Sequence, residues 1–277
     1  MKKLGDTYQT ALVTGGTSGL GLAFCKMLVE EGVETFSASR QPSKLPSLSG
    51  LHGLKIDLSD LPALSSFANQ FIEDHGVPDL LINNAGYGAF FEWGDFPEEE
   101  IAGQIGVMLQ APALLCRIFA PQMEKRGKGG IINVSSLAVQ YPLPYFSMYN
   151  AAKAGLSALS ASLIIEYHRQ APFVIDFRPG DFCTSFNEAS KRDSLESGDA
   201  VSTIWKTMDR RLSQAKSPVQ AARKLRAALI RGKSGIVYAG DFLQAGLGPA
   251  FHRLLPHRCL VSFLRYYHGF KPSTWFK

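Results

Sequence analysis

Residues 11–21, ALVTGGTSGLG, constrain the fold more than any other part of the chain. Apolar residues lead up to Thr14, and glycines follow at positions 15, 19 and 21 before a helical pattern begins. Glycine permits a sharp turn, a close approach of backbone to phosphate, and tight packing of a helix on a strand. The free N–H groups and positive dipole of the helix start then suit a phosphate. The stretch predicts a strand, a phosphate-binding turn and a helix; a plain glycine-rich loop is the alternative.

Strand and helix patterns alternate along the rest of the chain. Helical spacing covers residues 22–32, 62–75, about 97–125, a stretch of small residues from near Tyr149, and 218–232. Strand patterns cover residues 34–40, 55–60, 79–86, 130–136, 173–180 and 234–240. This alternation predicts a parallel sheet with helical crossovers. We expect one domain over residues 1–240, with a mobile lid at about 185–215, and an extension over 241–277 of the same domain.

Composition places the chain among ordinary globular proteins. It has 277 residues, of which 45% are hydrophobic, and this is enough for a large core. The four cysteines are far apart and are not matched with histidines, so we expect reduced thiols and no metal site. The start of the chain lacks an apolar stretch of secretory length, and nowhere do 18 apolar residues run together. A cytoplasmic location is therefore expected.

Charge is distributed unevenly. Residues 1–205 carry 15 Lys and Arg against 22 Asp and Glu, whereas residues 206–277 carry 14 against 2. This asymmetry indicates either an anionic partner near the C-terminal end, such as a membrane surface, an acyl carrier or a phosphate-bearing substrate, or a solvated basic helix and tail. Within the extension, Leu260, Val261, Leu264 and Tyr267 recur at helical spacing and predict a basic amphipathic helix. Such a helix either covers the substrate cleft and a neighbouring subunit or lies on an anionic membrane.

Four motifs, in this order and spacing, resemble those of the short-chain dehydrogenase/reductase family: the glycine turn 14–21, NNAG at 83–86, IINVSS at 131–136 and YNAAK at 149–153. The resemblance covers about residues 8–240. It implies a doubly wound, Rossmann-type parallel sheet of seven strands with helices on both faces. It also implies binding of NAD or NADP and hydride transfer between the nicotinamide and an alcohol or carbonyl carbon. A homodimer or homotetramer and no nucleic-acid partner are expected.

Tyr149 and Lys153 stand four residues apart, so their side chains share one helix face. A free tyrosine has a pKa of about 10, too high for easy proton exchange at neutral pH. A lysine cation about 4 Å away contributes about 4 kcal/mol at an effective dielectric constant near 20. We therefore expect Lys153 and a positively charged nicotinamide to lower the pKa of Tyr149. By the family resemblance, Ser136 is the catalytic serine that hydrogen-bonds the substrate oxygen, and its neighbour Ser135 serves as a control.

One position departs from the family pattern. Met108 stands where the family commonly has an asparagine that bends the long helix and holds a water for a proton relay to the lysine. A thioether cannot orient a water in that way. Either the relay uses a backbone carbonyl and solvent, which we favour, or turnover is weak.

The resemblance also assigns the cofactor site. Asp57 matches the acidic partner of the adenine amino group, Thr184 the residue that bonds the carboxamide, and Asn84 a neighbour of the adenine ribose. A helix cap at Asp57 and a plain turn at Pro179-Gly180 are the alternatives. The expected cofactor-binding residues are Gly15, Thr17, Ser18, Gly19, Leu20, Gly21, Ser39, Arg40, Asp57, Leu58, Asn84, Ala85, Gly86, Tyr149, Lys153, Pro179, Gly180 and Thr184.

The end of the second strand indicates which cofactor is used. NAD-binding proteins place a carboxylate there for the ribose hydroxyls, but this chain has Ser39 followed by Arg40. A guanidinium binds a 2′-phosphate with two parallel hydrogen bonds, so we expect NADP(H) to be preferred over NAD(H). The alternative is a surface arginine that contacts only solvent.

Together these patterns predict an NADP(H)-dependent carbonyl reductase or alcohol dehydrogenase. A protein with the same fold that binds NADP as a weakly catalytic sensor or scaffold is the alternative, motivated by Met108. Aromatic residues indicate an apolar small-molecule substrate, but they would also suit core packing or a subunit interface. These residues are Tyr87, Phe90, Phe91, Trp93, Tyr141, Tyr145 and Phe146.

Overall fold

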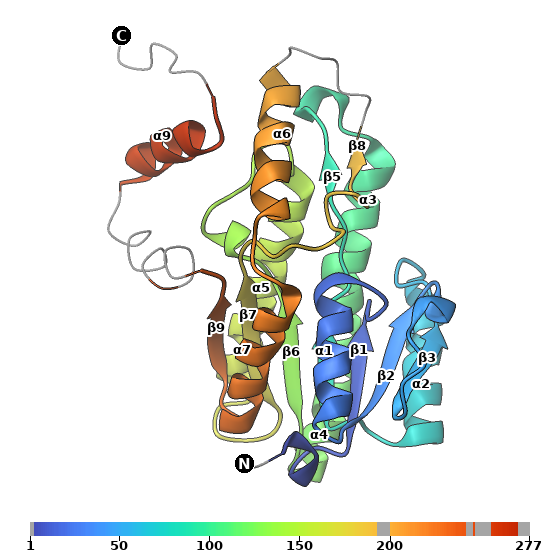
Figure 1. Cartoon of the computed structure of the whole chain (residues 1–277). Coiled ribbons are helices and arrows are strands. Elements are labelled where there is room, and N and C mark those ends of the chain that lie inside the picture. Colours follow the sequence, from blue (N-terminus) through green and yellow to red (C-terminus); the bar gives the residue numbers. More distant parts are fainter. Residues whose placement is uncertain (1–2, 193–199, 242–245, 247–255, 271–277) are drawn as a thin grey trace.

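The computed structural model describes residues 3–192, 200–241, 246 and 256–270. Its centre is a parallel sheet of seven strands in the order β3-β2-β1-β4-β6-β7-β9 (Figure 1). The strands are β1 (Thr10–Thr14), β2 (Glu34–Ser39), β3 (Leu51–Lys55), β4 (Leu80–Asn83), β6 (Gly130–Val134), β7 (Phe173–Pro179) and β9 (Gly235–Ala239). The doubly wound, Rossmann-type sheet expected from the sequence is thus confirmed.

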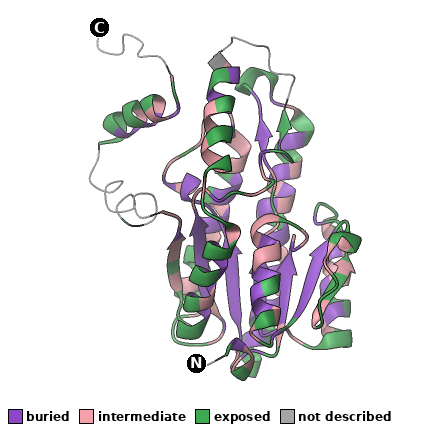
Figure 2. Cartoon of the chain, in the orientation of Figure 1, coloured by how far each residue is buried: buried purple, intermediate pink, exposed green. Residues whose placement is uncertain are grey.

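Helices cover both faces of the sheet, because its central strands are apolar on both sides. One face carries α1 (Gly19–Glu30) and α7 (Pro218–Arg231), where Phe24 packs edge-on against Phe177 of β7. The other carries α2 (Leu61–His75), α4 (Ala111–Arg126) and α5 (Ser147–Glu166), where Phe71 meets Phe119. Figure 2 shows the buried sheet between these two layers. Both layers fix the carboxyl ends of the strands along one edge.

The predicted strand at 55–60 is wrong in position, since β3 covers Leu51–Lys55. Its register with β2 runs from Thr35 opposite Leu51 to Ser39 opposite Lys55. As an edge strand with no buried residue, β3 has little apolar signal in the sequence. The apolar residues that follow, Ile56 and Leu58, are buried in the loop leading to α2.

A single long helix, Glu98–Arg126, runs through α3 (Glu98–Ile105), a π-helical turn (Gly106–Gln110) and α4. In the π turn the Ala111 N–H donates to the Gly106 carbonyl, five residues back. The helix is long and apolar enough to span a membrane, a test that core helices of globular proteins also pass. Here it packs on α2 and α5. A Cβ on Gly155 of α5 would lie 2.8 Å from the Leu109 side chain, which explains the small residues of that helix.

The predicted lid region contains structure that its sequence pattern did not indicate. Strand β8 (Lys191–Arg192) pairs with β5 (Ala89–Phe90), and α6 (Ala200–Ser213) is a helix. Trp205 of α6 is buried against Phe90, with ring centroids 4.8 Å apart. Whether the lid moves stays a prediction, and its residues 193–199 lie outside the described residues.

The predicted amphipathic helix of the extension is present as α9 (His257–Tyr267), with Leu260 and Leu264 buried. In Figure 1 it stands apart from the sheet, beyond β9 and beside α6. All four cysteines are free thiols. In the described part of the chain, no group of three or more His, Cys, Asp or Glu is arranged to hold a metal ion.

Candidate active site

All of the residues expected to bind cofactor or to act in catalysis line one cavity, with a volume of about 1510 Å³, at the carboxyl edge of the sheet. Ligands of doubly wound proteins bind at this edge, where the strand order reverses. The reversal here lies between β1 and β4, whose following turns both border the cavity.

Glycine is required at two positions of the first turn. Gly15 has a φ of 68°, and a Cβ there would lie 2.9 Å from the Cα of Ala85. A Cβ on Gly21 would lie 2.2 Å from the carbonyl oxygen of Gly15. The turn therefore leaves a backbone-lined cradle at the start of α1, which fits the pyrophosphate of a dinucleotide.

Asn84 and Thr14 hold the two turns together. The Asn84 amide donates to the carbonyls of Thr14 (3.0 Å) and Gly15 (3.1 Å). The Thr14 hydroxyl accepts the N–H groups of Asn84 (3.0 Å) and Ala85 (3.1 Å). The Asn84 side-chain amide therefore binds the backbone of the glycine turn. The next two residues, Ala85 and Gly86, line the cavity.

The adenosine end of the cavity is lined by Ser39, Arg40, Asp57 and Leu58. Arg40 is exposed, and the buried Ser39 hydroxyl has no partner among the described residues. Asp57 accepts the N–H (3.0 Å) and the hydroxyl (2.7 Å) of Ser59, and these bonds, together with the Arg40 charge, lower its pKa. The helix cap of α2 is Asp60, so the cap alternative for Asp57 is wrong.

The opposite wall follows β7. Pro179 ends that strand, and the Gly180 N–H donates to the Ala239 carbonyl at 2.7 Å. Thr184 approaches the glycine turn closely, since a Cβ on Gly19 would be 3.5 Å from the Thr184 Cβ. The unpaired Ser39 hydroxyl, the cradle and this facing wall together fit a nicotinamide dinucleotide.

Ser136, Tyr149 and Lys153 meet at the inner end of the cavity. Ser136 follows β6 and accepts the Ala138 N–H at 3.0 Å, while Tyr149 and Lys153 come from α5. Lys153 is only 4% exposed, and its ammonium lies 5.9 Å from the Tyr149 ring centroid and donates to the Val134 carbonyl at 2.7 Å. Burial lowers the pKa of Lys153 to about 8, against the opposing influence of the Asp176 charge.

The expected lowering of the Tyr149 pKa is not what this structure gives. Burial raises the pKa, a hydrogen bond with Ser136 lowers it, and the Asp181 charge raises it. Desolvation of the phenolate outweighs the Ser136 hydrogen bond. The sequence does not reveal this effect, because it depends on the side chains packed around the ring. One of these is Phe186, at a centroid distance of 5.4 Å.

Met108 lies within the π turn and is fully buried. A Cβ built on Gly86 would be 3.1 Å from the Met108 sulfur and 3.4 Å from the Lys153 ammonium, so both side chains reach the same spot. The π turn thus occupies the position where the family commonly has asparagine. Pro112 has no N–H to donate to the Met108 carbonyl, a bond that a regular α-helix would make.

The sequence analysis did not predict two polar groups beside the site, of which only Tyr87 was noted, as an aromatic residue. Tyr87, Glu100 and Lys191 form a cluster at the cavity rim, in which Lys191 pairs with the buried Glu100 carboxylate, and burial and Glu100 raise the pKa of Tyr87. The second group surrounds Asp176 and Arg178 of β7. Its only sequence signal is a pair of opposite charges, two residues apart, in a buried strand.

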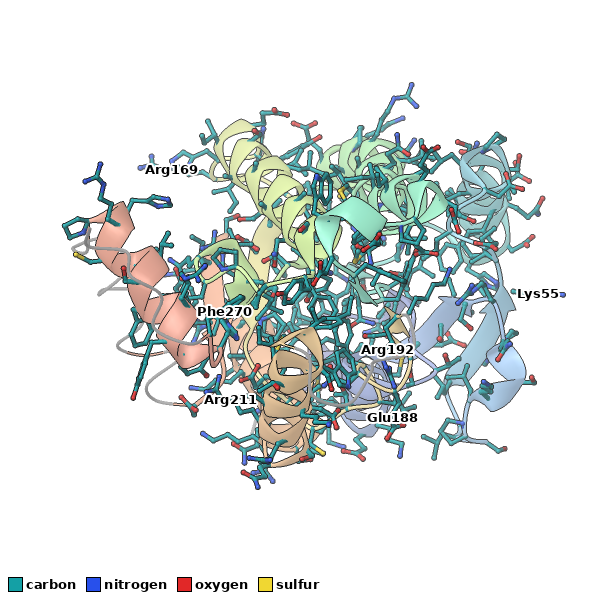
Figure 3. All side chains as sticks on the ribbon, turned by 90° about the horizontal axis from the view of Figure 1, so that it is seen from above. Lys55, Arg169, Glu188, Arg192, Arg211 and Phe270 are labelled. Atoms are coloured by element: carbon teal, nitrogen blue, oxygen red, sulfur yellow. The ribbon has the colours of Figure 1, made fainter. Side chains whose placement is uncertain are left out.

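The outer wall of the cavity comes from α6 and α9. Met208, Arg211 and Leu212 line it from α6, and Phe263, Leu264, Tyr267 and His268 line it from α9 and the residue after it. The Arg211 guanidinium stacks 3.8 Å from the Tyr267 ring centroid and joins the two helices. Figure 3 shows Arg211 on the side of α6 that faces α9, with Arg192 on the other side.

Of the aromatic residues noted in the sequence, Phe90 and Phe146 are packing residues buried with Trp205, and Phe146, Tyr87 and Tyr141 line the cavity.

Comparison with known proteins agrees with this geometry. Residues 9–195 match the profile of the family described as short chain dehydrogenase. A 3-ketodihydrosphingosine reductase of Bacteroides thetaiotaomicron is 32% identical over 65% of this chain and 66% of its own length. Human dehydrogenase/reductase SDR family member 4 is 32% identical over 65% of this chain and 68% of its own. The chain spans just under two thirds of the first of these relatives.

Solved structures show the same fold. A short-chain dehydrogenase from Streptomyces avermitilis superposes with a TM-score of 0.80 at 25% identity, covering 96% of this chain and 99% of its own. One from Burkholderia phymatum in complex with NAD has a TM-score of 0.77 at 21% identity (90% and 92% covered). A metagenomic short-chain oxidoreductase in complex with NADP has a TM-score of 0.67 at 28% identity, covering 85% of this chain and 97% of its own. The chain belongs to the short-chain dehydrogenase/reductase family.

Gly21→Ala tests the cradle. Its new Cβ would lie 2.2 Å from the Gly15 carbonyl, where contacts below 3.0 Å force the backbone to move. We expect nicotinamide cofactor binding to weaken at least tenfold by fluorescence titration. Gly94→Ala is the matched control, since no atom lies within 4 Å of a Cβ there, and its affinity should match the wild type. Equal affinity in both variants would contradict the cradle.

Proposed function

We propose that this protein is an NADP(H)-dependent oxidoreductase that transfers a hydride between the cofactor and a carbonyl or secondary alcohol substrate. The observation that carries the proposal is the convergence of Ser136, Tyr149 and Lys153 at the inner end of the cavity, beyond the glycine turn. Family membership supports the reaction class. Solved relatives in complex with NAD and with NADP support a nicotinamide cofactor without choosing between the two.

The three side chains have separate tasks. In the direction of reduction, the Tyr149 hydroxyl gives a proton to the substrate oxygen while the carbonyl carbon receives a hydride, which yields the alcohol. Ser136 hydrogen-bonds that oxygen as charge develops on it. Lys153 places a buried positive charge beside the phenol and so favours the phenolate left behind. A nicotinamide dinucleotide held by the glycine turn and the facing wall would supply the hydride, and its oxidised ring would add positive charge.

An apolar substrate fits the outer cavity. Leu137, Leu143, Phe146, Phe186, Met208 and Leu212 line it, together with the aromatic side chains of α9. One of the relatives is, by its name, a reductase of the keto compound 3-ketodihydrosphingosine. We therefore favour hydrophobic ketones as first substrates, including 3-ketoacyl thioesters, in a screen with NADPH and NADH.

The alternative is a weakly catalytic NADP-binding sensor or scaffold, which Met108 motivates. Its thioether fills the spot beside Lys153 where a relay water would bind. Against this, Ser136, Tyr149 and Lys153 are all present and line one cavity. Oxidation of NADPH with any carbonyl compound separates the two proposals, because the sensor predicts none above background.

We keep the cytoplasm as the proposed location and a homodimer or homotetramer as the proposed assembly.

Membrane contact through α9 is a further proposal, supported by Phe263 and Tyr266, which are exposed on a helix with Arg258 and Arg265 and no acidic residue. The protein should co-sediment with anionic vesicles at low salt and be released at high salt. Absence of binding at low salt would remove the membrane proposal.

Tyr149→Phe tests the proton donor. The ring still packs on Phe186, but the hydroxyl is lost, so turnover should fall at least about a hundredfold. The turnover of Ser136→Ala should fall by a similar factor. Ser135→Ala should fall much less, because Ser135 faces Asp176 rather than the cavity centre. Near-normal turnover of Tyr149→Phe with cofactor still bound would refute the mechanism.

Arg40→Ala tests the cofactor preference. A charge-assisted hydrogen bond contributes about 1.5–3 kcal/mol, which corresponds to roughly 10- to 150-fold in preference. The wild type should therefore prefer NADPH over NADH in kcat/KM, and the variant should lose most of that preference. Lys44→Ala is a useful comparison, since Lys44 also lines this end of the cavity. A wild type that uses NADH equally well would contradict the assignment.

A further inference from the structure

Behind the reaction centre, on the side away from the cavity, lies a buried carboxylate that the mechanism so far does not use. Asp176 of β7 is 1% exposed. One of its oxygens accepts a short hydrogen bond from the Ser135 hydroxyl, and the other accepts from Ser157 (2.7 Å) and from Nε of Arg178 (2.8 Å). A buried charge is costly unless it is paired and fully hydrogen-bonded, and this one is both.

The partners of Asp176 belong to the two segments that carry the reacting groups. Ser135 directly precedes Ser136, and the carbonyl of Val134, one residue earlier, accepts the Lys153 ammonium. Ser157 lies four residues after Lys153 and therefore on the same face of α5. One carboxylate thus joins the end of β6 to the face of α5 that carries Tyr149 and Lys153.

Arg178 completes the arrangement. Its Nη2 donates to the Ser157 hydroxyl at 2.8 Å, and its guanidinium lies 5.7 Å from the ring centroid of Tyr238 on β9. The charges that act on the reacting pair come from β7 and the segment after it: Asp176 raises the pKa of Lys153, and Asp181 raises the pKa of Tyr149. Val134 and Ser136 of the β6 end, Gly86 after β4 and Met108 of the long helix bring no charge.

We propose that Asp176 is a positioning residue for the Ser136, Tyr149 and Lys153 site, which fixes both catalytic segments and holds the buried Lys153 as a cation. The inference rests on the proposed function only for its kinetic consequence. Burial favours the neutral amine and so lowers the pKa of Lys153 below its ordinary value. The Asp176 charge opposes this effect, so that the pKa falls only to about 8. Without that charge, Lys153 would lose its proton at a lower pH.

The direct test is the titration of Lys153 itself, which needs no turnover. In full-length protein labelled with 13C at the lysine Cε, the Lys153 resonance is assigned with Lys153→Met and followed against pH. In Asp176→Asn its midpoint should move down by at least about 0.5 pH units relative to the wild type. The matched control is Asp74→Asn, which removes an exposed carboxylate on α2 and should cause no shift.

Asp176→Asn leaves Arg178 buried without its counter-charge, which by itself disfavours the Lys153 cation and endangers folding. Asp176→Asn/Arg178→Gln removes both charges and avoids that difficulty. A downward shift in the double variant supports the proposal, whereas a folded double variant in which Lys153 titrates as in the wild type overturns the electrostatic part.

The positioning part is read from kinetics. With cofactor affinity unchanged, Ser157→Ala should lower kcat several-fold without moving the Lys153 midpoint, because it removes a tie but no charge. In Asp176→Asn or the double variant, the alkaline limb of the rate profile should move down together with the Lys153 midpoint. Unchanged kcat in Ser157→Ala and the double variant overturns the positioning role. A wild type without turnover refutes the proposed function instead, and the Lys153 titration still decides the inference.

Discussion

The link between the turns after β1 and β4 is the interaction on which the site depends. Four hydrogen bonds made by the side chains of Thr14 and Asn84 join these turns, two between the pair itself and one each to Gly15 and Ala85. The missing side chain of Gly21 lets the Gly15 carbonyl lie against α1. The strand order reverses at this point, so the link sets the floor of the cavity. Any shift of either turn would move the phosphate cradle relative to the end of β6.

Much of the fold could be predicted because its signals are local. Glycine spacing, helical periodicity and buried apolar strands all act over a few residues, and they placed six of the seven sheet strands close to their positions. Strand β3 was misplaced because an edge strand buries little. The helix α6 was missed although Ile204, Trp205 and Met208 recur at helical spacing, because this short apolar face stands in a polar and charged stretch of the chain. The π turn at Met108 is likewise a matter of packing, here of Leu109 against Gly155.

The candidate site likewise contains residues that the sequence predicted and residues that it did not. Residues within motifs, such as Tyr149 and Lys153, were found from spacing, and the structure brings them into one cavity. The direction of the Tyr149 pKa was wrong, since desolvation depends on neighbours distant in sequence. Asp176 and Arg178 were missed for the same reason: their partners, Ser135 and Ser157, lie on other elements.

The outer wall of the cavity has a separate origin from its reaction centre. α6 and α9 supply the wall and are joined through Arg211 and Tyr267, while the Asp176 network stabilises the centre from the opposite side. Substitutions in the wall therefore leave the ties of the centre intact. A change in the shape of the wall can therefore alter which molecules the cavity admits without moving the side chains of Ser136, Tyr149 and Lys153.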